Sequence, residues 1–422
     1  MLREGSGNMI SPRMRQPRLT ALLLAAFPTS AVIAQSWILT SAPTNSWYSV
    51  AQSADGARIV AAAASETRFG TTDGLIYFST NSGATWLAAD APAAGWSSVA
   101  SSPDGINWLA ACPAYGVANG IYRSTNSGRS WGQVTFWSTN FWSAVASSAD
   151  GGRCVAADPG GGFVPARLFT STDAGATWAN TMNSYEAWSS LATSNDGTKW
   201  MATSQFQYGG VYFSGDGAQT WNLTTATGSL WSSVACSADG RQWVAAQQGV
   251  GIYLSSDSGA TWAKTAAPTA DWAGVASSAD GTRLVAIANH GPIYVSTNSG
   301  VDWNDSGAPT NYWKSVSSSA DGQKLVAVVG GIDGNAGEYS IGPIYTLQTT
   351  PAPVLSIRSS TSNLFISWTI PSMKFVLQQN SSLTSSGWLD VGALRNLNYT
   401  NLHYEVNLPP PGGPMFYRLT SQ

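Results

Sequence analysis

One octapeptide recurs along this chain, and its spacing restricts the possible folds more than any other feature. The first copy is STNSGATW at 79–86, and near-copies follow at 124–131, 171–178, 214–221, 255–262 and 296–303. The tryptophans that end successive copies lie 41 to 47 residues apart. A repeat of about 40–50 residues is typical of one blade of a β-propeller.

A second segment recurs in step with the octapeptide. Its consensus is WSSVASSADG, and its seven copies begin at Trp47, Trp96, Trp142, Trp188, Trp231, Trp272 and Trp313. Each copy predicts a strand that ends in an Asp-Gly turn, where glycine supplies the positive φ. Two more apolar runs and the residues after the octapeptide complete four short strands in each repeat. The pattern therefore predicts an all-β chain that contains a seven-bladed β-propeller.

The first apolar segment of the repeat region indicates how the ring closes. Trp37 precedes Trp47 by ten residues, and Trp86 precedes Trp96 by the same number. The Trp37 segment therefore corresponds to an outer strand whose three partners lie at the far end of the ring. We expect it to pair with the strand at Ile344 and to close the last blade, which removes a free sheet edge.

The octapeptide resembles the Asp-box, or BNR repeat, of the sialidase-like propeller superfamily, whose pattern is Ser-x-Asp-x-Gly-x-Thr-Trp. The aspartate position is occupied by Asn81, Asn126, Asp173, Asp216, Asp257 and Asn298. We expect these side chains to accept hydrogen bonds from backbone N–H groups of the turn. Three of the copies carry asparagine, so a carboxylate is dispensable there. The resemblance implies a structural turn on the face opposite the ligand site.

The N-terminus indicates a secreted protein. Arg13, Arg15 and Arg18 precede an apolar run over 19–34, which is typical of a secretory signal peptide cleaved after Ala34. No later apolar run is long enough to span a membrane. The net charge of −3, with 10% charged residues, gives no field that would attract nucleic acid. We expect a secreted or cell-surface monomer without cofactors.

The domain boundaries follow from these segments: a signal peptide over 1–34, the propeller over 35–349 and a C-terminal module over 350–422. Six alternating runs after a Thr/Pro linker predict a small β-sandwich. This module resembles the immunoglobulin- or fibronectin-like modules that end many bacterial secreted proteins. Trp368 and Trp388 are expected in its core.

The three cysteines form no metal-binding pattern. Cys154 aligns with core residues of the second strand of other repeats, so it is expected to be a buried thiol. Cys112 ends such a strand and is expected to be the most exposed of the three. A disulfide between Cys112 and Cys154 is the one pairing that the sequence allows us to consider. Cys236 replaces a serine in the first strand of its repeat.

The longest and most varied connections of the repeat are predicted on one face, called here the loop face. Asp-Gly turns and octapeptides share the opposite face, called here the turn face. Variable loops on a rigid scaffold commonly carry function. The seven repeated tryptophans are expected to pack between blades, whereas unrepeated side chains are the ligand-binding candidates. These candidates are Glu66, Tyr115, Trp137, Glu186, Tyr208 and Tyr312.

The residues favour binding over catalysis. A sialidase needs three arginines for the substrate carboxylate, but Arg58, Arg153, Arg241 and Arg283 follow Asp-Gly turns and fall on the turn face. Sialidases of this kind also have six blades. The photosystem II assembly-factor propeller is similar too, but its repeat differs from VASSADG and this chain lacks an obvious basic docking patch. We expect a secreted, non-catalytic binding or scaffold propeller that recognises an extracellular glycan or protein.

The alternative is a polysaccharide-active glycoside hydrolase, either sialidase-like or xyloglucanase-like. Xyloglucanase-like enzymes place two propellers around one cleft, and this chain has one. A hydrolase would use two carboxylates about 5–10 Å apart. The acidic residues expected on the loop face are Glu66, Asp73, Asp158, Glu186, Asp271, Asp333 and Glu338. No sequence motif marks any pair of them.

Overall fold

A computed structural model gives the fold of this chain. It describes residues 36–64, 74–113, 119–134, 141–160, 164–332, 339–348, 355–360, 362–369, 375–382, 387–392, 396–398 and 403–421. In these ranges every regular element is a β-strand. The same ranges contain no helix long and apolar enough to cross a membrane.

The repeats form antiparallel four-stranded sheets in chain order. The first two contain β2 (Trp47–Gln52), β3 (Ile59–Ala63), β4 (Ile76–Ser79) and β5 (Leu87–Ala88), then β6 (Ser98–Ser101), β7 (Trp108–Cys112), β8 (Gly120–Ser124) and β9 (Gly132–Gln133). The third contains β10 (Ala144–Ser147), β11 (Cys154–Asp158), β12 (Ala166–Ser171) and β13 (Ala179–Ser184). The next two contain β14 (Trp188–Thr193), β15 (Trp200–Ser204), β16 (Gly210–Ser214) and β17 (Asn222–Thr227), then β18 (Trp231–Cys236), β19 (Trp243–Gln247), β20 (Gly251–Ser255) and β21 (Ala263–Lys264).

An eight-stranded sheet joins the last repeats. Its strands are β22 (Trp272–Ser277), β23 (Leu284–Gly291), β24 (Ile293–Ser296), β25 (Asn304–Asp305), β26 (Asn311–Ser318), β27 (Lys324–Ile332), β28 (Tyr339–Gln348) and β1 (Trp37–Leu39). The two halves meet where Asn289 pairs with Tyr312 and Gly291 pairs with Asn311. Strand β1 pairs with β28, with Trp37 opposite Leu347, as the sequence predicts.

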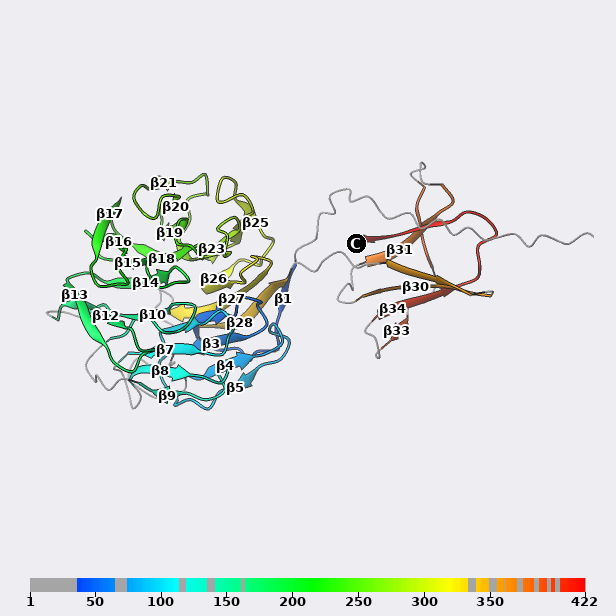
Figure 1. Cartoon of the computed structure of the whole chain (residues 1–422). Helices are drawn as coiled ribbons and strands as arrows, with labels where there is room; N and C mark the ends of the chain where they lie inside the picture. Colours follow the sequence, from blue (N-terminus) through cyan, green and yellow to red (C-terminus); the bar gives the residue numbers. More distant parts are fainter. Residues whose placement is uncertain are drawn as a thin grey trace, which may run out of the picture.

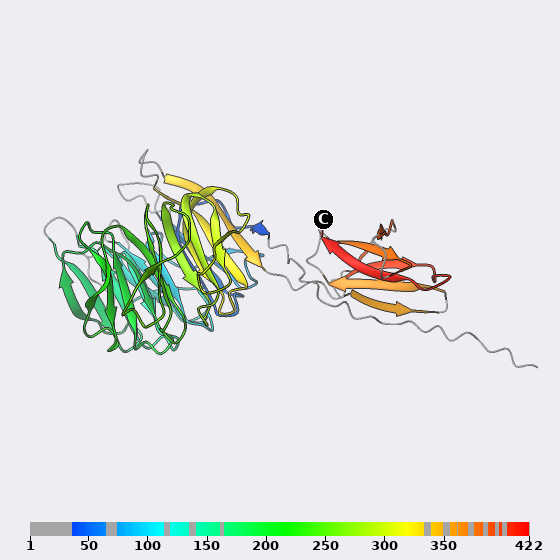
Figure 2. The same ribbon diagram turned by 90° about the horizontal axis from the view of Figure 1, so that it is seen from above.

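The sheets form a ring around a centre, which Figure 1 shows and Figure 2 shows from a second direction. The first strand of each repeat contacts the first strand of the next, and β26 contacts β2. A backbone hydrogen-bond chain follows this ring through the Asp-Gly turns. Ala320 N–H donates to Ala54 O at 2.8 Å, and Ala54 N–H donates to Pro103 O at 2.7 Å. The chain is interrupted at Pro103, because proline has no N–H to donate to the third repeat.

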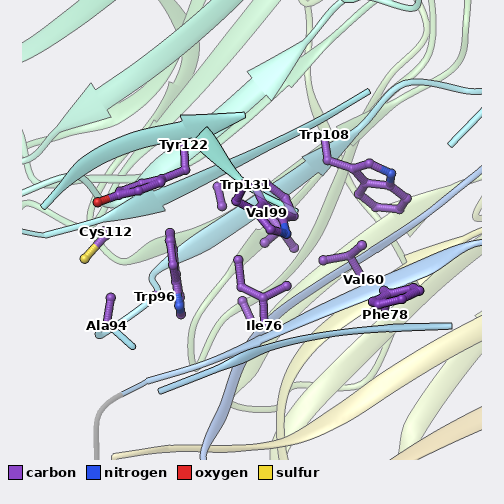
Figure 3. Close-up of a cluster of buried hydrophobic side chains, with 12 residues drawn as sticks. Val60, Ile76, Phe78, Ala94, Trp96, Val99, Trp108, Cys112, Tyr122 and Trp131 are labelled. Carbon is purple, nitrogen blue, oxygen red and sulfur yellow. The ribbon is translucent and has the colours of Figure 1, made fainter. Parts of the chain in front are cut away.

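The core lies between neighbouring sheets as well as within them. Val60 of β3 and Phe78 of β4 belong to the same buried cluster as Val99 of β6 and Trp108 of β7 (Figure 3). Each repeated tryptophan also packs edge-to-face on an aromatic residue of its own third strand, with centroids 5.1–5.5 Å apart. Such pairs stabilise by about 0.5–1.5 kcal/mol beyond the buried area.

The expected exposure of Cys112 is wrong. Cys112 is fully buried in the cluster of Figure 3, which combines residues of its own repeat with residues of the preceding repeat. All three cysteines are free thiols, so the Cys112–Cys154 bridge is not formed. Burial raises the pKa of both Cys112 and Cys154 to about 12. These two thiols are therefore protonated and unreactive at neutral pH.

The C-terminal strands form two further sheets. One contains β29 (Leu355–Ser359), β30 (Leu364–Thr369), β34 (His403–Leu408) and β33 (Asn396–Asn398), and the other contains β32 (Leu389–Asp390), β31 (Phe375–Asn380) and β35 (Phe416–Ser421). Trp368 is buried in a cluster to which both sheets contribute, as expected. Trp388 was also expected in the core, but it is only half-buried and lies outside this cluster, with the Arg418 guanidinium 4.3 Å from its ring centroid.

Ring closure by β1 can be tested with one substitution. Trp37 packs 6.1 Å from Trp313, and its indole N–H donates to Ser306 Oγ at 2.8 Å. We expect Trp37→Ala to lower the free energy of unfolding by about 2 kcal/mol, since the side chain is half-buried. Ile38→Ala is the matched control in the same strand, because Ile38 is 52% exposed and its loss should cost under about 0.5 kcal/mol. Urea unfolding measures both, and equal midpoints would contradict closure through Trp37.

Candidate functional site

The turn face is held together by side chains that reach the next repeat. Lys199 Nζ donates to Gly240 O in an Asp-Gly turn at 3.3 Å and to Ser258 Oγ in an octapeptide turn at 3.2 Å. Both kinds of turn therefore lie on one face, as predicted. Arg58 Nη1 likewise donates to Asp104 O at 2.6 Å. The guanidinium of Arg58 serves this contact between repeats and is not part of an arginine cluster for a ligand.

The octapeptide turns contain the same hydrogen bonds whether the acidic position is aspartate or asparagine. Asp173 accepts from the Thr177 N–H through Oδ1 at 2.8 Å and from the Thr177 hydroxyl through Oδ2 at 2.5 Å. Asn81 accepts from the Thr85 N–H at 2.9 Å, and its amide donates to the Thr85 hydroxyl at 2.8 Å. The same backbone bond forms at Asn126, Asp216, Asp257 and Asn298.

The aspartates of these turns are strongly acidic. The Thr177 hydroxyl and N–H lower the pKa of Asp173 to about 2, and those of Thr261 do the same for Asp257. The donors stabilise the ionised carboxylate, which is already engaged by its own turn. This arrangement suits a structural cap rather than a general acid, whose pKa would lie near neutral pH.

We call the first strand of each repeat the inner strand. The repeated tryptophans at or just before the start of the inner strands are buried. Their exposed fractions are 2% or less for Trp47, Trp96, Trp142, Trp188, Trp231, Trp272 and Trp313. Rings enclosed in this way cannot stack on a ligand. The exposed aromatic side chains of the loop face are therefore unrepeated ones.

Three such residues form what we call the aromatic patch: Tyr185, Phe206 and Tyr208. They are 76%, 42% and 79% exposed, and the rings of Phe206 and Tyr208 lie 6.3 Å apart. Their two loops are joined by the backbone bond from Gln205 N–H to Ala187 O at 2.9 Å. Tyr208 was predicted from the sequence. Tyr185 and Phe206 were not among the binding candidates, although both depart from the repeat on the loop face, which is the signal that could have identified them.

Glu186 lies between the two loops of the patch, but its carboxylate is directed inward. The Tyr212 hydroxyl donates to Oε1 at 2.6 Å. Oε2 is buried without a hydrogen-bond partner among the described residues, and a Cβ on Gly209 would lie 2.7 Å from it. Burial, with the Glu186 carboxylate next in importance, raises the pKa of Tyr212. Glu186 therefore supports the patch from beneath.

Tyr312 belongs to a second group, at the junction of β23 and β26. Its ring centroid lies 3.9 Å from that of His290, which is exposed and has a φ of 55°. Asn289 Nδ2 donates to Asp271 Oδ2 at 3.3 Å. The positive φ of His290 is costly for a residue with a side chain, so the pairing of β23 with β26 must compensate for it.

The other acidic residues expected on the loop face either hydrogen-bond within their own loops or lie outside the described residues. Asp158 is buried and accepts from the N–H groups of Phe141 at 3.2 Å and Gly160 at 3.0 Å. These bonds give it a role in its own loop. The other predicted site residues lie outside the described residues: Glu66, Asp73, Tyr115, Trp137, Asp333 and Glu338. Among the described residues, no three His, Cys, Asp or Glu side chains form a group that could hold a metal ion.

Comparison with known proteins supports the fold and does not identify the site. No protein-family model matches the chain, and no curated protein matches it. YCF48 from Cyanidioschyzon merolae is similar in structure, with a TM-score of 0.55, 12% identity and coverage of 74% of this chain and 99% of that one. A structure of YCF48 bound to D1 peptide gives 0.53 and 12%, over 75% of this chain and 97% of that one. At this identity the likeness shows the fold alone: the chain contains a β-propeller.

The octapeptide caps predict an acid-dependent loss of stability. Asp173 and Asp257 have pKa values of about 2 in the folded chain, below the ordinary aspartate value of 3.8. A depressed pKa contributes stability that is present above pH 4 and is lost as the pH falls toward 2. We expect Asp173→Asn/Asp257→Asn to remain folded at neutral pH, because asparagine already serves at Asn81. Its urea midpoint should fall less than that of the wild type between pH 4 and pH 2.

Parallel midpoint curves for the two proteins over that range would contradict this assignment. Asp90→Asn is the control, because Asp90 lies outside every octapeptide. It should leave the acid-dependent loss unchanged.

Proposed function

We propose that this chain is a secreted, non-catalytic binding propeller whose loop face recognises an extracellular glycan. The single observation that carries the proposal is the aromatic patch. Its rings are exposed on loops tied by backbone hydrogen bonds, whereas the repeated tryptophans are enclosed. Exposed aromatic groups held in place in this way lose little conformational freedom on binding.

The proposed architecture is a seven-bladed Asp-box propeller of the sialidase-like kind over 35–349, followed by a small β-sandwich over 350–422. The ring of inner-strand contacts, the octapeptide caps and the closure by β1 support the blade count. Secretion rests on the signal-like segment over 1–34. The sandwich is supported by the two C-terminal sheets that share one buried cluster.

A glycan is favoured because the patch is aromatic and carries little charge. Flat rings such as Tyr185 and Tyr208 match the apolar faces of pyranose sugars, and their hydroxyl groups stay free to hydrogen-bond with the ligand. Glu186, which lies beneath the patch, is occupied by the Tyr212 hydroxyl. We therefore infer that the aromatic patch itself recognises its ligand by ring stacking.

A protein ligand is the second candidate. It is favoured by the propeller fold shared with YCF48, of which one structure is bound to D1 peptide. The alternative function, of a different class, is hydrolysis of a polysaccharide. It would need two of the loop-face carboxylates about 5–10 Å apart, yet Asp158, Glu186 and Asp271 each hydrogen-bond within their own repeats.

A glycan array run beside a reducing-sugar assay on the same polysaccharides tests this function. We expect retention on the array without release of sugar. Tyr208→Ala should weaken the retained interaction about tenfold, since a central aromatic contact commonly contributes more than about 1 kcal/mol. Leu87→Ala is the matched control, because Leu87 is 62% exposed on the outer strand β5, away from the loop face.

Release of sugar that disappears when a loop-face carboxylate pair is replaced would establish the hydrolase instead. Binding that Tyr208→Ala leaves intact would show that the aromatic patch is not the site. Binding to no glycan would overturn the proposal and favour a protein ligand.

A further inference from the structure

Five of the inner strands share a β-bulge directly after the repeated tryptophan. The register shifts directly after the first tryptophan in β2, β14, β18, β22 and β26. The extra residues are Tyr48, Ser189, Ser232, Ala273 and Lys314. A bulge leaves its residue out of the ladder and often directs it toward a functional site. The fold therefore presents equivalent positions around the ring, near the loop-face ends of the inner strands.

Serine at this position serves the fold. Ser189 Oγ donates to Trp231 O in the next repeat at 2.6 Å, and Ser232 Oγ donates to Trp272 O at 2.7 Å. Ser97, which occupies the same place before β6, donates to Trp142 O at 2.7 Å. A small hydroxyl side chain is thus sufficient for the contact between neighbouring repeats.

Two adjacent positions depart from this pattern where the ring closes. Lys314 of β26 lies with Nζ 4.0 Å from the ring centroid of Tyr48 of β2. Both residues are half-buried. Within the described part of the chain, Lys314 has no carboxylate at salt-bridge distance. The fold places serine or alanine at equivalent positions, so packing alone does not require a lysine beside a tyrosine here.

Such a lysine is ready to bind an anion. Its charge is strong enough at this place to lower the pKa of Tyr48, against the effect of burial. One ammonium group can form a charge-assisted hydrogen bond with a single anionic group such as a carboxylate.

We propose that Lys314 and Tyr48 form a subsite at the loop-face end of the ring that binds the carboxylate of an acidic sugar. This inference rests on the proposed glycan-binding function and names its ligand class. Lys314 would donate a charge-assisted hydrogen bond to the carboxylate, and the Tyr48 ring would hold the lysine stem in place. The aromatic patch on the fourth repeat would contact neutral parts of the same glycan class independently.

Calorimetric titration of the mature chain with tri-galacturonic acid and with its methyl ester tests the subsite. The two sugars have the same length and differ in charge. We expect the acid to bind about 10- to 100-fold more tightly than the ester, which is the range that one charge-assisted hydrogen bond gives. Lys314→Met should abolish this preference, and Lys314→Arg should retain most of it.

Lys314→Ser is the matched control for folding, since serine occupies the equivalent bulge at Ser189 and Ser232. It should keep the wild-type urea midpoint and lose the preference for the acid. Equal binding of acid and ester by the wild type, no binding of either, or a preference that survives in Lys314→Ser would overturn the subsite. Displacement of the acid by a glutamate-rich peptide at lower concentration would assign the subsite to an acidic protein instead.

The failure of this inference is distinguishable from the failure of the proposed function. If neutral glycans bind through Tyr208 while the acid has no advantage, the propeller binds glycans and the subsite is wrong. If the array retains no glycan at all, both fail together.

Discussion

Each inner strand of this propeller pairs with the second strand of its own repeat, and the structure depends on how its opposite edge is satisfied. Unpaired backbone N–H groups are costly when buried. The preceding repeat in the ring supplies acceptors: Val99 N–H donates to Ser49 Oγ at 3.0 Å, and Val50 N–H donates to Ser315 Oγ at 3.2 Å. The second of these bonds joins the last repeat to the first. A hydroxyl two residues after the tryptophan therefore links repeats that could not fold alone.

The same dependence divides the molecule into a uniform face and a variable one. On the turn face, Asp-Gly turns bond to one another around the ring, and long cationic side chains lie over the neighbouring turns. These contacts need the same residues in each repeat, which explains the low sequence variation there. The loops of the opposite face take no part in this chain of turns, and they carry exposed rings such as Tyr185 and Tyr208.

Departures from the repeat are informative because the repeat shows what the fold requires. Pro103 interrupts the hydrogen-bond chain of the turns, yet the other links suffice to hold the ring. Lys314 and Tyr48 replace small residues where serine would bridge the repeats. This departure from the repeat is the reason for proposing a ligand subsite there.

The sequence by itself determined the strands, the octapeptide caps and the pairing of the Trp37 segment with the last repeat. The spacing of the repeats and the residues of their turns are local properties of the sequence. The Trp37 segment is recognised as an outer strand because it precedes Trp47 by the same number of residues as Trp86 precedes Trp96. The sequence also located the loop face and Tyr208 on it. It did not predict the burial of Cys112 or the inward direction of Glu186.

Only the tertiary structure decided those features, because each depends on what a neighbouring segment covers. Cys112 ends a strand, but the adjoining repeat encloses it. Glu186 is polar and lies in a loop, yet the glycine at 209 leaves room for its carboxylate to reach Tyr212. Trp388 is apolar, but it is only half-buried outside the core cluster, and Arg418 stacks on its ring. A repeat specifies the direction of each side chain within its own sheet. Contacts between sheets decide whether that direction leads to solvent, to the core or to a partner.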